Sequence, residues 1–104
     1  MGPHEFIRKA VWKIAEKFHP QKVILFGSHA SAKANRESDI DLLIIVRHRR
    51  NSTQRYLAIS RELEPRLFPI DLLVRSAKEI RERLKRGDSF IKEILQNGKV
   101  LYES

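Results

Sequence analysis

Residues 23–46 read VILFGSHASAKANRESDIDLLIIV, and this stretch decides the fold. It opens with a short apolar run, residues 23–26, that is rich in strand-forming side chains and is stopped by Gly27. A polar connection follows, and residues 40–46 then predict a second strand that is buried on both faces toward its end. The stretch therefore predicts two neighbouring strands joined by a polar segment.

The segment before this stretch has the periodicity of a helix. Apolar residues recur there in one stripe that ends near His19 and Pro20, comprising Ile7, Ala10, Val11, Ile14, Ala15 and Phe18. Trp12 does not share the spacing of the stripe, and a half-buried core position is predicted for it.

The sequence after this stretch continues the alternation of helices and strands. A helix is predicted over residues 56–67, bent or ended by its internal proline. Residues 69–74 predict a third strand, with a proline at its first position, where a missing N–H is tolerated. Ser76 and Glu79 have capping-box spacing and begin a helix that continues to about residue 85.

The last predicted elements are short. Asp88 or Ser89 can cap a helix that stops at residues 97–98, and residues 100–102 can add a final strand. Helices that alternate with three or four strands indicate an α/β (α+β) fold, in which a small mixed sheet packs against helices. A single domain spanning residues 1–104 is expected.

Composition limits the classes of function. Twenty-one Lys and Arg residues against thirteen Asp and Glu residues leave a net charge of +8, which attracts polyanions such as nucleotides, nucleic acid or an acidic protein. Nucleic acid is less favoured, because few aromatic residues are interleaved with the basic ones. No apolar run reaches membrane-spanning length, there is no cysteine, and no secretion signal is recognisable, so a cytoplasmic protein is expected.

Two carboxylates begin the second predicted strand. Asp39 and Asp41 are two residues apart, so their side chains point to the same face. Carboxylates held together repel each other unless a cation lies between them. Magnesium is the natural cation, because it prefers hard oxygen ligands and commonly combines carboxylates with substrate phosphates.

A third carboxylate begins the next strand. Asp71 precedes an apolar run, where an acidic side chain is costly if it is buried without a partner. If this strand lies beside the second one, Asp71 joins Asp39 and Asp41. Three carboxylates can hold two metal ions that activate an attacking oxygen and stabilise a leaving phosphate.

Gly27 and Ser28 form the other half of the expected site. Glycine has no Cβ and lets the backbone approach a ligand closely, while Ser28 supplies a hydroxyl at the start of a turn or helix that favours phosphate. The ten residues between Ser28 and Asp39 allow a short helical turn and a return into the next strand. This arrangement suits phosphoryl-type transfer, in which catalysis is mainly positioning and charge neutralisation.

The sequence resembles the DNA polymerase β-like nucleotidyltransferase superfamily. The resemblance rests on Gly27-Ser28, the ten-residue spacing, the run Ser38-Asp39-Ile40-Asp41-Leu42, and the run Pro69-Ile70-Asp71-Leu72-Leu73-Val74. It covers nearly the whole chain, and the size matches the minimal nucleotidyltransferases, which are antitoxin partners of HEPN-domain toxins.

This resemblance implies an activity and a partner. Members of that group transfer AMP from ATP to a tyrosine of the toxin, a ribonuclease, and so silence it. By resemblance, Asp39 and Asp41 ligate both magnesium ions, while Asp71 ligates one and helps to activate the acceptor hydroxyl. Gly27, Ser28 and Ser38 would contact the nucleotide.

The turn after the serine departs from the family pattern. Relatives often have a pattern like Arg-Ala-Arg-Gly there, whereas this chain has HASA at residues 29–32. His29 could hydrogen-bond a phosphate or the acceptor, but a solvated loop histidine is the preferred interpretation.

Two other classes of function remain open. One is a nucleotidyltransferase that acts on a small hydroxyl compound, as in antibiotic-modifying relatives, which usually carry an added helical domain. The other is a non-catalytic module that binds a toxin or RNA through its +8 charge. The protein acceptor is favoured, because no second domain is expected to hold a small acceptor.

Overall fold

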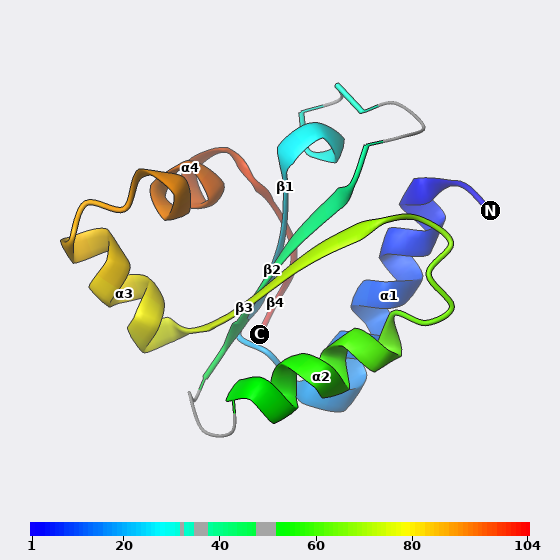
Figure 1. Ribbon diagram of the computed structural model, residues 1–104, viewed down its shortest axis with the longest axis horizontal. Helices are drawn as coiled ribbons and strands as arrows, with labels where there is room; N and C mark the ends of the chain where they lie inside the picture. Colours follow the sequence, from blue (N-terminus) through cyan, green and yellow to red (C-terminus); the bar gives the residue numbers. More distant parts are fainter. Residues whose placement is uncertain (32, 35–37, 48–51) are drawn as a thin grey trace.

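Helices cover both faces of one four-stranded sheet (Figure 1). The computed structural model describes residues 1–31, 33–34, 38–47 and 52–104. Among these residues, none of the helices is long and apolar enough to cross a membrane. The elements in chain order are α1 Pro3–Phe18, β1 Lys22–Phe26, the 3₁₀ helix η1 Gly27–His29, β2 Ile40–Val46, α2 Ser52–Glu62, β3 Ile70–Ser76, α3 Ala77–Lys85, α4 Ser89–Asn97 and β4 Lys99–Glu103.

The sheet is mixed, with the strand order β3-β2-β1-β4. The strand β1 pairs antiparallel with both β2 and β4, whereas β2 and β3 are parallel. Parallel neighbours need a crossover connection, and α2 provides it on one face of the sheet. The predicted α/β fold with a small mixed sheet of three to four strands is therefore confirmed.

The central strand β2 divides the interior into two cores. Leu42 and Ile44 pack on the side of α1 and α2, while Leu43 and Ile45 pack on the side of α3 and α4. All four side chains are buried, as predicted for a strand that has helices on both faces. This alternation also determines the face to which Asp41, the polar residue of β2, points.

The predicted caps of α3 and α4 are present. The buried Ser76 Oγ accepts a hydrogen bond of 3.1 Å from the Glu79 N–H, and the Glu79 carboxylate accepts one of 3.0 Å from the Ser76 N–H. Asp88 caps α4, where its carboxylate accepts from the Ile91 N–H at 3.0 Å. Both caps satisfy backbone N–H groups that have no partner inside the helix.

One prediction in the helices was wrong. Trp12 was expected to be half-buried, but 66% of its surface is exposed, because it lies off the apolar stripe that α1 turns toward the sheet. The second predicted helix ends at Glu62, before its internal proline, which is one of the two effects expected of that proline, and Leu67 beyond it is 55% exposed. Pro65 explains the early end, since proline disfavours helical geometry at the residue before it.

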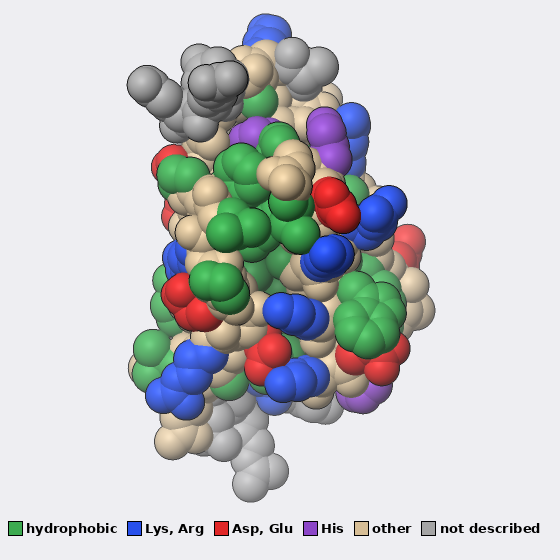
Figure 2. All heavy atoms as spheres, turned by 90° about the vertical axis from the view of Figure 1, so that its right-hand side faces the viewer, with side chains coloured by type: hydrophobic (Ala, Val, Ile, Leu, Met, Phe, Trp, Pro, Cys, Tyr) green, Lys and Arg blue, Asp and Glu red, His purple; other side chains and the backbone are tan. Residues whose placement is uncertain are grey.

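Figure 2 shows hydrophobic side chains at the surface of the α1–α2 side, interspersed with Lys and Arg.

Ser76→Ala is expected to lower the free energy of unfolding by about 1 kcal/mol, because the first turn of α3 loses its cap. Urea unfolding measures this loss, with Ser89→Ala as the matched control at an exposed serine in the first turn of α4. Equal losses from the two substitutions would contradict the role of the capping box.

Candidate active site

Asp41 and Asp71 occupy equivalent positions on the neighbouring parallel strands β2 and β3. Their Cα atoms are register partners. The residues on either side of Asp41, Ile40 and Leu42, pack on the α1–α2 side, so Asp41 points to the α3–α4 side. Leu72 packs on the α1–α2 side in the same way, which puts Asp71 on the same face as Asp41. The fold therefore brings these two carboxylates together from positions 30 residues apart (41 and 71).

Asp39 lies immediately before β2 and is exposed, as is Asp71, whereas Asp41 is partly buried. The charge of Asp39 acts on Asp41 in the same direction as the charge of Asp71. Asp41 is thus the inner carboxylate of the three, and the other two are open to solvent.

Gly27 lies directly against Asp41. It follows Phe26, the register partner of Asp41 on β1, and has a positive φ of 74°. A Cβ on Gly27 would lie 2.2 Å from Asp41 Oδ2, well inside van der Waals contact. Only glycine leaves the carboxylate in this position and adopts this backbone conformation without strain.

Backbone hydrogen bonds hold the turn that follows Gly27. The Gly27 carbonyl accepts from the N–H groups of Ala30 and Ser31 at 3.1 and 3.2 Å. The carbonyl of the half-buried Ser28 accepts from the Lys33 N–H at 3.1 Å and from the Ser31 hydroxyl at 3.3 Å. The turn is a single 3₁₀ turn. Ala32, the last residue of the HASA segment at 29–32, lies outside the described residues.

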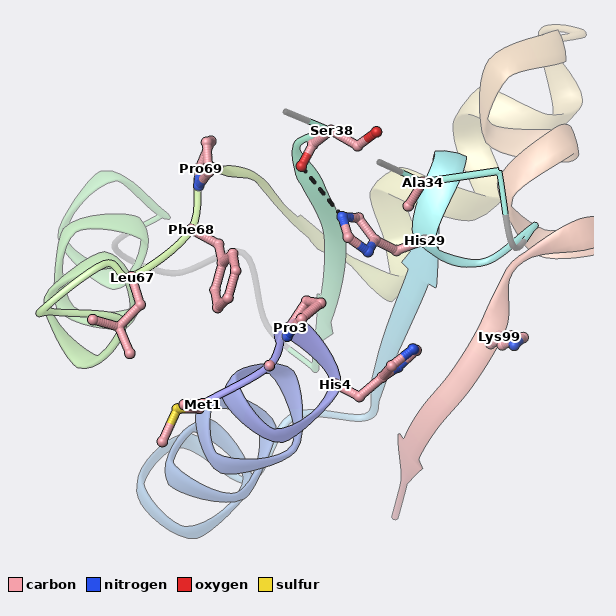
Figure 3. A pocket seen from close by; sticks show the side chains of 11 residues that line it. Met1, Pro3, His4, His29, Ala34, Ser38, Leu67, Phe68, Pro69 and Lys99 are labelled. Atoms are coloured by element: carbon pink, nitrogen blue, oxygen red, sulfur yellow. Dashed lines mark hydrogen bonds between the residues drawn. The ribbon is translucent and has the colours of Figure 1, made fainter. Parts of the chain in front are cut away.

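His29 joins this turn to the strand that carries Asp41. The expectation of a solvated histidine was wrong, because its side chain is buried and only 7% of the residue is exposed. Its Nε2–H donates to the Ser38 carbonyl oxygen at 3.2 Å, since a carbonyl can only accept (Figure 3). The bond ties the Gly-Ser turn to the residue before Asp39. No sequence signal marked this contact, which depends on how the turn folds back over β2.

Electrostatics at this site favour a cation. Burial, then the charge of Asp71, then that of Asp39 raise the pKa of Asp41 above its ordinary value, and His29 acts in the opposite direction. Each of the three causes that raise the pKa opposes an ionised Asp41. A cation held by these oxygens would relieve the repulsion.

The described residues form no group of three or more histidine, cysteine or acidic side chains that could hold a metal ion. A complete three-carboxylate cage is therefore not assembled from the protein alone. Magnesium does not need one, because it is usually bound by one or two carboxylates together with substrate phosphates and water. The Asp41–Asp71 pair, with Gly27 directly against Asp41, fits such a site, in which phosphates and water supply the other ligands of the ion.

A large open hollow of about 1060 Å³ lies on the other face of the sheet. Its lining includes His4 at the start of α1, His29, Ser38 and the segment 67–69 (Figure 3). The carboxylates point to the α3–α4 face, so this hollow is not their binding cleft. His29 lines this hollow and also acts on the charge of Asp41, so it lies between the hollow and the carboxylates.

Comparison with known proteins agrees with this arrangement. A protein-family model described as "Polymerase beta, Nucleotidyltransferase" matches residues 9–104. No match was found among curated proteins.

Two solved structures share the fold. The first is a proposed nucleotidyltransferase from Sulfolobus solfataricus, with a TM-score of 0.66 and 20% identity over 95% of this chain and 78% of that chain. The second is a chain from a toxin–antitoxin structure with AMP-PNP, with a TM-score of 0.62 and 20% identity over 93% of this chain and 73% of that chain.

Gly27→Ala is expected to displace the Asp41 carboxylate, because the new Cβ would overlap Asp41 Oδ2. The carboxyl ¹³C resonance of Asp41 should move in this variant. Gly87→Ala is the matched control, since Gly87 has a similar φ of 80° but open space around it. Both variants should lose about 1 kcal/mol of stability from the positive φ. An Asp41 resonance that stays in place in Gly27→Ala would refute the close approach.

Asp41→Asn is expected to raise the unfolding temperature at neutral pH in metal-free buffer. Because the native pKa of Asp41 lies above its ordinary value of 3.8, the folded chain binds this proton more tightly than the unfolded chain. Stability therefore falls as the pH rises between the two pKa values and stays lowered at neutral pH. Asparagine removes this loss, and its advantage should fade as the pH falls below 3.8.

Asp88→Asn provides a control of opposite sign. The hydrogen bond from the Ile91 N–H is the main cause that lowers the pKa of Asp88, so its ionised form stabilises the fold at neutral pH. Its replacement should lower the unfolding temperature there. Thermal unfolding followed by circular dichroism across the pH range tests both variants, and shifts in the same direction would contradict this account.

Proposed function

The chain belongs to the polymerase β nucleotidyltransferase family, and we propose that it is a minimal nucleotidyltransferase that adenylylates a HEPN-type toxin. In this reaction AMP passes from ATP to a hydroxyl group, most simply a tyrosine, of the toxin, which is thereby neutralised. The observation that carries the proposal is the in-register Asp41–Asp71 pair, in which Asp41 lies directly against Gly27.

Asp41 and Asp71, joined by the exposed Asp39 and completed by triphosphate oxygens and water, would hold the two magnesium ions. The chemistry of these ions would be charge neutralisation on the triphosphate and activation of the attacking oxygen. The raised pKa of Asp41 supports this assignment, because burial, followed by the charges of Asp71 and Asp39, opposes its ionised form when no cation is bound. This arrangement does not stabilise the fold, and perturbed carboxylates of this kind cluster at functional sites.

The remaining residues of the site bind and orient the nucleotide. Gly27 would let the backbone approach the triphosphate, and Ser28 and Ser38 would contact the nucleotide. His29 fixes the turn by its bond to the Ser38 carbonyl. The acceptor oxygen attacks the α-phosphorus as the bond to pyrophosphate breaks, and Asp71 helps to take up the hydroxyl proton.

An acceptor supplied by another protein agrees with the exposure of the site. Asp39 and Asp71 are both exposed, so a side chain from a separate molecule can reach them. The structural neighbour that was solved as a toxin–antitoxin assembly with AMP-PNP gives further support for a toxin partner. The net charge of +8 would also favour an acidic partner surface.

The double variant Asp39→Asn/Asp41→Asn is expected to lose AMP transfer by at least a hundredfold, because transition-state charge loses its main stabilisation. The assay incubates the chain with magnesium, ATP labelled at the α-phosphate, and a HEPN-type toxin encoded next to it. Label in the toxin and a mass increase of one AMP measure the product.

The control for this assay is Glu16→Gln, which removes a carboxylate from the exposed side of α1 and should leave transfer unchanged. Circular dichroism checks that both variants are folded. The proposal fails if the double variant neutralises the toxin as well as the parent chain, or if the parent binds no nucleotide in the presence of magnesium.

A further inference from the structure

We propose that the exposed ring of Phe90 is the surface on which the base of the bound nucleotide stacks. The inference rests on the proposed function, since it concerns the nucleotide of the same site. It begins from an exposed aromatic residue: Phe90 is the second residue of α4, and 53% of its surface is exposed.

Phe90 lies on the same face of the sheet as the carboxylates. Its ring contacts Phe26, with ring centroids 5.8 Å apart and an interplanar angle of 81°. Phe26 packs with the α3–α4 core and is the register partner of Asp41. Asp41 therefore neighbours Phe26 on the adjacent strand, and Phe26 in turn contacts the exposed ring of Phe90.

Phe90 also lies at the correct end of that face. Phe26 is the last residue of β1, directly before the Gly27 cradle. Figure 1 shows α4 beside the end of β1 that leads into η1, so the helix borders the carboxylate end of the sheet. A nucleotide whose phosphates bind over Gly27 and Asp41 would extend its ribose and base away from the sheet on the α3–α4 side, where the ring of Phe90 contacts Phe26.

The packing of Phe90 leaves its ring available. A near-perpendicular contact with Phe26 holds one side of the ring, while more than half of the residue remains in solvent. A ring that is fixed but exposed is a good stacking surface, because little conformational freedom is lost when a base covers it. Stacking tolerates every base, so this ring would supply affinity without selecting adenine.

Paired titrations test the proposal, with a non-hydrolysable ATP analogue and inorganic triphosphate as the two probes, both with magnesium. Phe90→Leu keeps an apolar side chain against Phe26 but removes the aromatic face. It should weaken binding of the ATP analogue roughly tenfold and leave triphosphate binding unchanged. Phe90→Tyr should restore the binding of the analogue. Leu84→Ala, which truncates an exposed apolar side chain on α3, is the control and should change neither.

A spectroscopic reporter gives an independent readout. Trp12 is the only tryptophan and is exposed on α1, so the variant Trp12→Phe/Phe90→Trp carries a single tryptophan at the proposed surface. Its fluorescence should be quenched by ATP and by GTP, and not by inorganic triphosphate.

The outcomes separate this inference from the proposed function. Unchanged analogue binding in Phe90→Leu, or equal losses for the analogue and for triphosphate, would overturn the stacking surface alone. Unchanged analogue binding combined with weaker toxin association would assign Phe90 to a protein interface instead, which also overturns it. A parent chain that binds neither probe would overturn the proposed function and this inference together.

Discussion

Asp41 is a partly buried carboxylate whose surroundings disfavour its charge, and the rest of the site is arranged around it. Burial and the charges of Asp71 and Asp39 all raise its pKa, while Gly27 lies so close that a Cβ could not be accommodated. A structure built only for stability would have an apolar or neutral side chain at this position. The strain is electrostatic, and a bound cation with a polyphosphate would relieve it.

The sheet topology produces this arrangement through backbone register. Because β2 pairs with β3 in parallel and with β1 in antiparallel orientation, the start of β2 meets the start of β3 and the end of β1. The alternation of side chains then sends both carboxylates to the α3–α4 face, while Ile40 and Ile70 pack on the other face. The large hollow beside His4 lies on the opposite face of the sheet, so its size alone would have pointed to the face away from Asp41 and Asp71.

Two residues show where local sequence was insufficient. Trp12 is exposed because it lies off the apolar stripe that α1 turns toward the sheet. His29 is buried because its turn folds back onto the Ser38 carbonyl, a contact across nine residues of sequence. Both outcomes depend on packing between segments, whereas the end of α2 before Pro65, which leaves Leu67 exposed, is a local effect of the proline.

The sequence by itself determined the strands, the helix caps and the spacing of the aspartates that are proposed to bind metal. Those features are local: apolar runs of strand length, a Ser76–Glu79 capping box, and aspartates spaced to share one face. Only the tertiary structure decided that Asp71 lies in register with Asp41 and that the Asp41 carboxylate leaves no room for a Cβ at Gly27. It also decided that His29 holds the turn by a hydrogen bond to the Ser38 carbonyl. These depend on strand order and on close packing between distant segments, which no local pattern encodes.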